Sequence, residues 1–140
     1  MSISRRDFVA ALAATGTIMA VSKPADAHEG CVVHGDAFPV YVIATVTAKP
    51  GKRDELIRLL KTIVPDVHAE DGYLYYEPAV DVETGLPAQD PLRPDVMVVV
   101  EKWASLEALR VHLDAPHMGP YREAVKDIVE GVTLQVLRPA

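Results

Sequence analysis

The order of β-type and helix-type segments after residue 40 is the feature that most restricts the fold. Segments dense in β-branched and aromatic residues cover residues 40–49, 73–81, 95–103 and 132–138. A helical stripe of apolar residues follows the first segment, and helical spacing returns between the third and the fourth. This β-α-β-β-α-(α)-β order predicts an α+β fold of the ferredoxin-like, split βαβ type, with an antiparallel sheet and its helices on one face.

The first helix is predicted from an apolar stripe that ends before Gly72. Its members stand at i, i+3, i+4, i+7 and i+11: Leu56, Leu59, Leu60, Ile63 and Val67. Pro65 lies inside this stripe, so we expect a kink or a split in the last turn. Ser105 is a good N-cap for a second helix, and a shorter helix is expected over residues 120–129.

Apolar residues occupy both parities of segments 40–49 and 95–103, so both faces of the sheet need cover. Helices cover one face, and a second copy of the same sheet is the simplest cover for the other. We therefore expect a homodimer, in the form of a dimeric α+β barrel. Pro78 cannot donate a ladder hydrogen bond, which places segment 73–81 at a sheet edge or at a bulge.

The N-terminal residues have the features of an export signal. The sequence "SRRDFV" resembles the twin-arginine signal, an apolar run follows over residues 9–21, and "ADA" at 25–27 suits a cleavage site. We predict a signal peptide over 1–27, a lead-in segment over 28–39, one domain over 40–140, and a periplasmic location. No run of 18 apolar residues occurs, so a stable membrane span is not expected.

Charge and cysteine content exclude several classes of function. The formal net charge is −6, and the longest basic run is a pair, which argues against nucleic acid as a partner. The single cysteine excludes an internal disulfide framework. His28, Cys31 and His34 lie close together near the predicted mature N-terminus, and their donors suit Cu or Zn. A non-catalytic periplasmic protein that binds a metal or a small molecule is therefore one alternative.

Two stretches, "EDGYLYYEP" and "VMVVVEKWASLEALRVHLDAPHM", resemble the antibiotic biosynthesis monooxygenase family of dimeric α+β barrels. The matching positions are Glu70, Gly72, Tyr75 or Tyr76, Glu101, Trp103, Ser105, Ala108, His112, Leu113 and His117. The resemblance implies a cofactor-independent monooxygenase that oxidises a quinol or another polyphenolic aromatic substrate with O2. It also implies an apolar cavity between sheet and helices, in which the protein eases proton removal and excludes water.

The predicted catalytic residues are His112, Trp103, Tyr76 and Glu101. His112 borders the apolar face of its helix and is the natural proton acceptor near neutral pH. Trp103, at the end of its strand, is expected to form a flat wall for the aromatic substrate. Glu101 shares the parity of Trp103 and is expected to orient a histidine or to pair with an arginine. Tyr75 and Tyr76 point to opposite faces, so at most one of them lines the pocket.

Tyr75 and two further histidines, His117 and His68, are candidates for the substrate pocket. His117 stands five residues after His112, which places the two on different faces of an ideal helix. Pro116 should end the helix before His117, so a solvent-exposed loop position is expected there. His68 lies near the end of the first helix, where a contact with the helix dipole is the simpler interpretation.

Other activities on the same fold remain open from sequence. Relatives that degrade haem use a strand tryptophan and a helix histidine, and Trp103 and His112 have comparable spacing. Those relatives also use an asparagine, and this chain contains none. The missing asparagine argues against haem degradation, but it argues less against simple haem binding. An isomerase or another small-molecule enzyme is a third alternative. Neither a nucleotide-binding loop, a Ser-His-Asp signature nor an H-E-x-x-H motif is present, and no cofactor is predicted.

Overall fold

The computed structural model describes residues 38–140. The predicted signal peptide, most of the lead-in segment and the cluster of His28, Cys31 and His34 lie outside these residues. The elements in chain order are β1 (Val40–Ala48), α2 (Arg53–His68), β2 (Tyr73–Ala79), β3 (Val96–Trp103), α3 (Leu106–Leu113), α4 (Met118–Val125) and β4 (Val129–Leu137).

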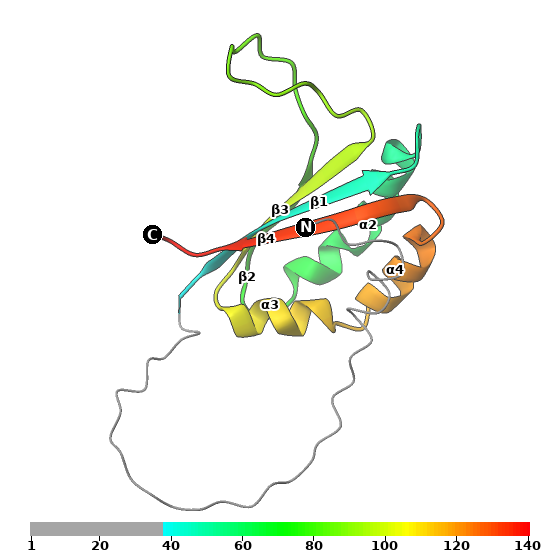
Figure 1. The fold of residues 1–140 in the computed structure, drawn as a ribbon. Coiled ribbons are helices and arrows are strands. Elements are labelled where there is room, and N and C mark those ends of the chain that lie inside the picture. Colours follow the sequence, from blue (N-terminus) through cyan, green and yellow to red (C-terminus); the bar gives the residue numbers. More distant parts are fainter. Residues whose placement is uncertain (1–37) are drawn as a thin grey trace, which may run out of the picture.

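The strands form one antiparallel sheet in the order β2-β3-β1-β4, and α2, α3 and α4 lie on the same side of it (Figure 1). The ferredoxin-like α+β prediction is therefore confirmed. β2 is an edge strand, as Pro78 indicated, and its register with β3 shifts between Tyr73 and Tyr75. The long loop from β2 to β3 extends away from the sheet (Figure 1).

The core lies between the sheet and the helices because alternate residues of the two central strands face the same way. Val42, Ala44 and Val46 of β1 are buried, as are Met97, Val99 and Trp103 of β3. The helices contribute Leu56, Leu60, Ile63, Val67, Leu109, Met118 and Val125. The stripe predicted for the first helix is thus the one that packs on the sheet.

Two helices have other boundaries than a split at Pro65 and a helix over residues 120–129 would give. Pro65 does not split α2, which continues to His68. Pro65 has no backbone N–H to bond the carbonyl group of Lys61, four residues earlier. Both residues are exposed, so water can form the missing hydrogen bond with that carbonyl group. The last helix ends at Val125, earlier than predicted, and β4 begins at Val129 because Ala48 provides a pairing partner there.

The sheet face opposite the helices carries apolar side chains at its surface. Residues on this face that are exposed or partly exposed include Tyr41, Ile43, Tyr75, Val98, Val100 and Leu137. Lys102 crosses this face, with its ammonium group 5.1 Å from the centre of the Tyr41 ring. The single chain therefore leaves this face without the cover that an apolar surface of this kind usually has.

Within residues 38–140, the structure contains no helix that combines the length and the apolar character needed to cross a bilayer.

Candidate functional site

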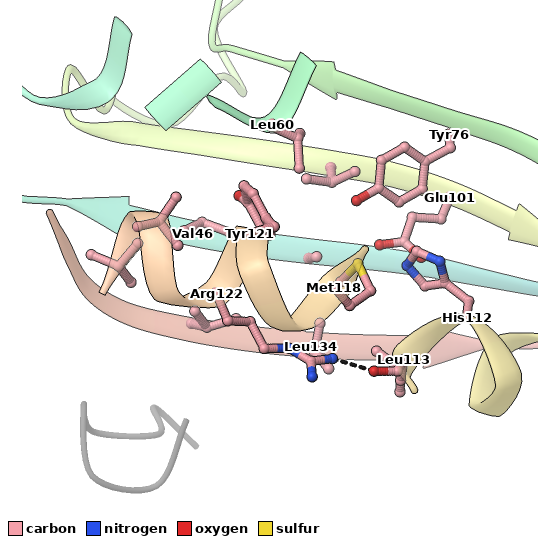
Figure 2. Close-up of a pocket in the computed structure, with 15 residues that line it drawn as sticks. Val46, Leu60, Tyr76, Glu101, His112, Leu113, Met118, Tyr121, Arg122 and Leu134 are labelled. Carbon is pink, nitrogen blue, oxygen red and sulfur yellow. Dashed lines mark hydrogen bonds between the residues drawn. The ribbon is translucent and has the colours of Figure 1, made fainter. Parts of the chain in front are cut away.

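A cavity of about 220 Å³ lies between the sheet and the helices (Figure 2). Its walls are mainly apolar and come from all four strands and from α2, α3 and α4. Five polar side chains reach it: Tyr76, Glu101, His112, Tyr121 and Arg122. Apolar walls with a few convergent polar groups are typical of a small-molecule site.

His112 is the polar residue at which the geometry of this site converges. It stands in the last turn of α3, and only 1% of its surface is exposed. Its ring stacks on Trp103 with centroids 4.5 Å apart and meets the Tyr76 ring edge-on at 5.4 Å. Nδ1 lies 2.9 and 3.1 Å from the two carboxylate oxygens of Glu70.

This contact determines where the imidazole carries its proton. A carboxylate only accepts hydrogen bonds, so Nδ1 is the donor and Nε2 of the neutral ring keeps its lone pair. Burial lowers the pKa of His112 below its usual 6.5, although the hydrogen bond and charge of Glu70 act in the opposite direction. The His112 imidazole is therefore neutral at pH 7, and Glu70 orients it.

Gly72 explains how Glu70 comes to lie beside His112, 42 positions away in the chain. The turn after α2 needs a positive φ of 83° at Gly72, which glycine adopts without strain. A Cβ atom at Gly72 would lie 2.5 Å from the Cβ of Ala108 in α3. The Gly72 carbonyl also accepts a hydrogen bond from the Ala104 amide at 2.8 Å. This close approach brings the turn against α3.

Trp103 and Glu101 do not have the contacts predicted for them. The Trp103 side chain is fully buried behind His112 and is absent from the cavity wall, so it supports the histidine instead of a substrate. Its Nε1 donates a hydrogen bond of 2.9 Å to Glu101 Oε2. Glu101 therefore neither orients His112 nor pairs with an arginine. Burial raises the pKa of Glu101 to about 7, although the Trp103 hydrogen bond lowers it.

The two adjacent tyrosines separate as their opposite parity required. Tyr76 is buried and lines the cavity, and burial, followed by the charge of Glu101, raises the pKa of its hydroxyl well above the usual value. Tyr75 is 47% exposed and lies on the other face of the sheet, so its assignment to the pocket was wrong. His68 is also outside the cavity; its exposed ring packs on Tyr73 at 4.6 Å.

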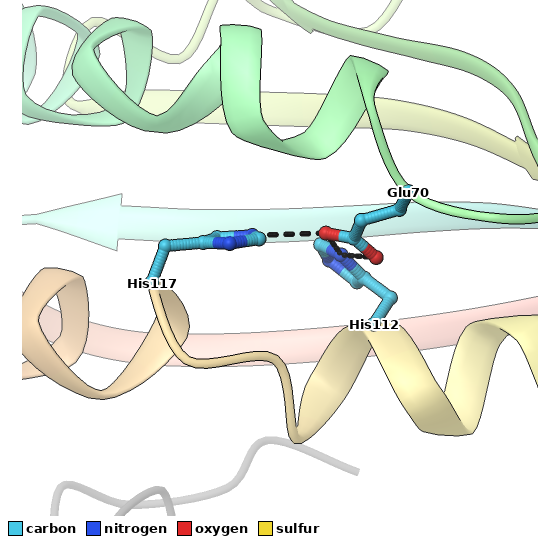
Figure 3. Close-up of side chains that lie close together, drawn as sticks. All are labelled: Glu70, His112 and His117. Atoms are coloured by element: carbon cyan, nitrogen blue, oxygen red, sulfur yellow. Dashed lines mark hydrogen bonds and ion pairs between the residues drawn. The ribbon is translucent and has the colours of Figure 1, made fainter.

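His117 is not the exposed loop residue that was expected. It directly precedes α4, and its side chain is only 16% exposed. A short turn joins α3 to α4, and it places His117 against the same carboxylate as His112 (Figure 3). Its Nε2 lies 2.9 Å from Glu70 Oε1. Donor atoms of Glu70, His112 and His117 all lie within 4.8 Å of one another, a grouping that could hold a metal ion.

Sequence reasoning missed Glu70, Tyr121 and Arg122 as site residues. Glu70 belongs to the quoted stretch "EDGYLYYEP", and its place in that motif was the available signal. Tyr121 and Arg122 lie three and four positions after Met118, which is the spacing of one helix face. Arg122 Nη2 donates to the Leu113 carbonyl, and this bond joins α4 to the end of α3 (Figure 2).

Comparisons with known proteins agree with this architecture. Residues 39–124 match the family model described as "Antibiotic biosynthesis monooxygenase". The chain is 38% identical over 100 residues to the "Probable quinol monooxygenase YgiN" of Escherichia coli K12, covering 70% of this chain and 95% of that protein. Two crystal structures each give a TM-score of 0.60: PA3566 from Pseudomonas aeruginosa and Rv0793 from Mycobacterium tuberculosis. Their sequences are 26% and 29% identical, and the matches cover 74% and 73% of this chain and 95% of each of theirs.

The fold and the cavity define a class of protein, a ferredoxin-like α+β domain that encloses a small-molecule site between its sheet and its helices. Within that class, the chain belongs to the antibiotic biosynthesis monooxygenase family.

Proposed function

We propose that this monooxygenase oxidises a quinol or a related polyphenol with O2 in the apolar cavity, and that His112 is the general base. The observation that carries the proposal is the buried His112 ring, held between Trp103 and the Glu70 carboxylate at the cavity wall. The similarity to a quinol monooxygenase over most of the chain supports the substrate class.

The cavity suits a small aromatic substrate. Its volume of about 220 Å³ is below the range of about 300–1,000 Å³ found for drug-sized ligands. One or two fused rings match this size better than a large polycycle or a haem. Val46, Leu60 and Val99 offer apolar contacts for the rings, while the polar groups gather toward His112 and Arg122.

The first step in this proposal is loss of a phenolic proton to Nε2 of His112. Glu70 favours this step because its carboxylate stabilises the imidazolium cation that forms. Arg122, the cationic side chain in the described cavity wall, favours the phenolate that remains. Apolar walls exclude water, so both electrostatic effects are stronger than they would be in solvent.

The remaining chemistry needs no external reductant, because the substrate supplies every electron. The quinol anion transfers one electron to O2, and the resulting radicals combine to form a carbon–oxygen bond. Cleavage of the peroxide O–O bond leaves one oxygen atom in the product, and the other leaves as water. Quinol and O2 thus give a hydroxyquinone and water, with atoms and electrons balanced.

An oxygen-electrode screen of hydroquinones with one or two fused rings tests this proposal. Chelator-treated protein should consume O2 at least as fast as untreated protein, and faster than the substrate autoxidises without protein. Activity that disappears with the chelator, or the absence of activity with every substrate, would contradict the proposal. His112→Gln tests the base, and His68→Gln is a matched control because His68 lies outside the cavity.

We also propose that two copies associate through the open sheet face, forming a dimeric barrel. The exposed apolar residues of that face, Tyr41, Tyr75 and Leu137 among them, support this assembly. Sedimentation at micromolar concentration should find a dimer. Ile43→Lys, in the centre of the open sheet face, should shift the protein from dimers to monomers. An unaltered chain that is already monomeric would contradict the proposal.

We further propose that the chain is exported to the periplasm by the twin-arginine route. The support for this is the sequence "SRRDFV" followed by the apolar run over residues 9–21.

A further inference from the structure

Glu70, His112 and His117 present three potential metal ligands from three separate segments. Glu70 follows α2, His112 stands in the last turn of α3, and His117 precedes α4 (Figure 3). Nδ1 of His112 and Nε2 of His117 each lie 2.9 Å from the same oxygen, Oε1 of Glu70. Zn–N and Zn–O bonds of about 2.0–2.2 Å place neighbouring ligand atoms roughly 3 Å apart. The Glu70 oxygen already lies at about that distance from each imidazole nitrogen, and the two nitrogens lie within 4.8 Å of each other.

The contact between His117 and Glu70 does not satisfy the histidine nitrogen. The distance is short, but the direction does not suit a hydrogen bond. Nε2 of His117 is buried and has no hydrogen-bond partner in the part of the chain that the structure describes. An unpaired buried polar atom destabilises the folded chain. A metal ion in front of the ring would accept the lone pair and remove this destabilisation.

A second cavity, separate from the apolar one, gives an ion access to this cluster. It has a volume of about 540 Å³, and Glu70 and His117 are among the residues that line it. Four further carboxylates line it: Asp66, Asp71, Glu107 and Asp114. Arg110 is the one lysine or arginine among the described lining residues, and it lies 3.5 Å from Glu107. The surplus of negative charge raises the local concentration of cations.

We propose that Glu70, His112 and His117 form a binding site for a divalent first-row transition ion such as Zn²⁺. Two imidazoles and one carboxylate are typical ligands for such ions, and they leave further coordination positions for water. The ion enters from the acidic cavity and binds on the opposite side of His112 from the apolar cavity.

Occupation of the site has a consequence for His112, and this consequence rests on the proposed function. A metal ion on Nδ1 displaces the proton that Glu70 holds there, so the neutral ring carries its proton on Nε2. Nε2 is then a hydrogen-bond donor and cannot take a proton from the substrate. The ion is therefore an inhibitor of quinol oxidation.

Calorimetric titration of the chelator-treated full-length chain with Zn²⁺ tests the site directly. We expect one ion per chain. His117→Ala and Glu70→Gln should each weaken binding by at least about 100-fold, because loss of even an outer partner costs 10–100-fold. Co²⁺ should give a visible absorption band with the unaltered chain and lose it with His117→Ala. Thermal melting curves must show that each variant is folded.

Two controls separate this site from other histidines. His68→Ala should bind zinc as the unaltered chain does. A triple variant, His28→Ala, Cys31→Ser and His34→Ala, removes the N-terminal cluster and should also retain one ion. The proposal is overturned if folded His117→Ala binds zinc within about threefold of the unaltered chain, or if the triple variant alone loses the ion.

Measured separately, the activity distinguishes this proposal from the proposed function. Zinc should suppress O2 uptake at the concentrations at which the titration shows binding. Absence of zinc binding in an active protein would overturn the metal site and leave the oxygenase proposal intact. Zinc binding without inhibition would confirm the site and contradict the role of His112 as base.

Discussion

Replacing Glu101 by glutamine should remove a loss of stability that the unaltered chain undergoes as the pH rises. Glu101 is 6% exposed, and its main hydrogen-bond donor is the Trp103 indole. Burial raises its pKa from 4.5 to about 7. Between these pH values the unfolded chain has lost the proton while the folded chain retains it, so the free energy of unfolding falls with increasing pH.

The size of the effect follows from the two pKa values. Each pH unit between them corresponds to 1.36 kcal/mol, so the total loss is about 3 kcal/mol. The loss begins near pH 4.5 and is complete above pH 7. Glutamine keeps an oxygen that can accept the Trp103 hydrogen bond and does not ionise. If the glutamine amide group itself destabilises the folded chain, it does so equally at every pH. It therefore shifts the whole plot of unfolding free energy against pH and does not change its slope.

Urea denaturation at one fixed protein concentration, repeated between pH 5 and pH 8, measures this difference. The stability of Glu101→Gln relative to the unaltered chain should increase by about 2–3 kcal/mol across that range, because part of the loss occurs below pH 5. Glu107→Gln is the matched control, because Glu107 is an exposed glutamate on α3. A Glu101→Gln curve that is flat to about 1 kcal/mol would mean that Glu101 ionises without penalty, and the physical reasoning would be refuted.

Three further predictions concern the turn, the orienting carboxylate and export. Gly72→Ala should lower the free energy of unfolding by about 2–4 kcal/mol, because alanine would have an unfavourable positive φ and its Cβ would collide with the Cβ of Ala108. Urea denaturation measures this loss, and unchanged stability would contradict the packing of the Gly72 turn on α3. Glu70→Gln should lower kcat for quinol oxidation at least about tenfold with little change in KM, because the His112 imidazolium loses its counter-charge. Equal kcat values for the variant and the unaltered chain would exclude Glu70 as the residue that stabilises this cation. The double variant Arg5→Lys and Arg6→Lys should stay in the cytoplasm with its N-terminus uncleaved, which cell fractionation and blotting would show. Normal export of this variant would rule out the twin-arginine route.

Much of the fold was predictable because its determinants are local. Period-two burial in β1 and β3, the stripe of α2 and the cap at Ser105 each depend on neighbouring residues in the chain. Ser105 does cap α3, accepting a hydrogen bond from the Ala108 amide at 3.1 Å. A split at Pro65 does not occur, because water can reach the Lys61 carbonyl group, and whether it can depends on how the helix packs on the sheet.

The site was predictable only in part, because its contacts are not local. The helical wheel placed His112 at the edge of an apolar face, and parity separated Tyr75 from Tyr76. Parity also favoured Glu101 as the partner of His112, but the Trp103 indole takes that carboxylate. The carboxylate that does orient His112 belongs to Glu70, and only the packing of the Gly72 turn on α3 brings it there. No periodicity in either segment carries that information.

The central claim, that His112 at the apolar cavity promotes insertion of one oxygen atom from O2 into a quinol, has a direct isotopic test. Metal-stripped protein is supplied with ¹⁸O2 and a hydroquinone that the oxygen-electrode screen identifies, and the product is analysed by mass spectrometry. The account predicts one ¹⁸O atom per product molecule, formed at a rate at least about 100-fold lower in His112→Gln and unchanged in His68→Gln. A product without the label, or one formed equally fast by the His112 variant, would contradict it.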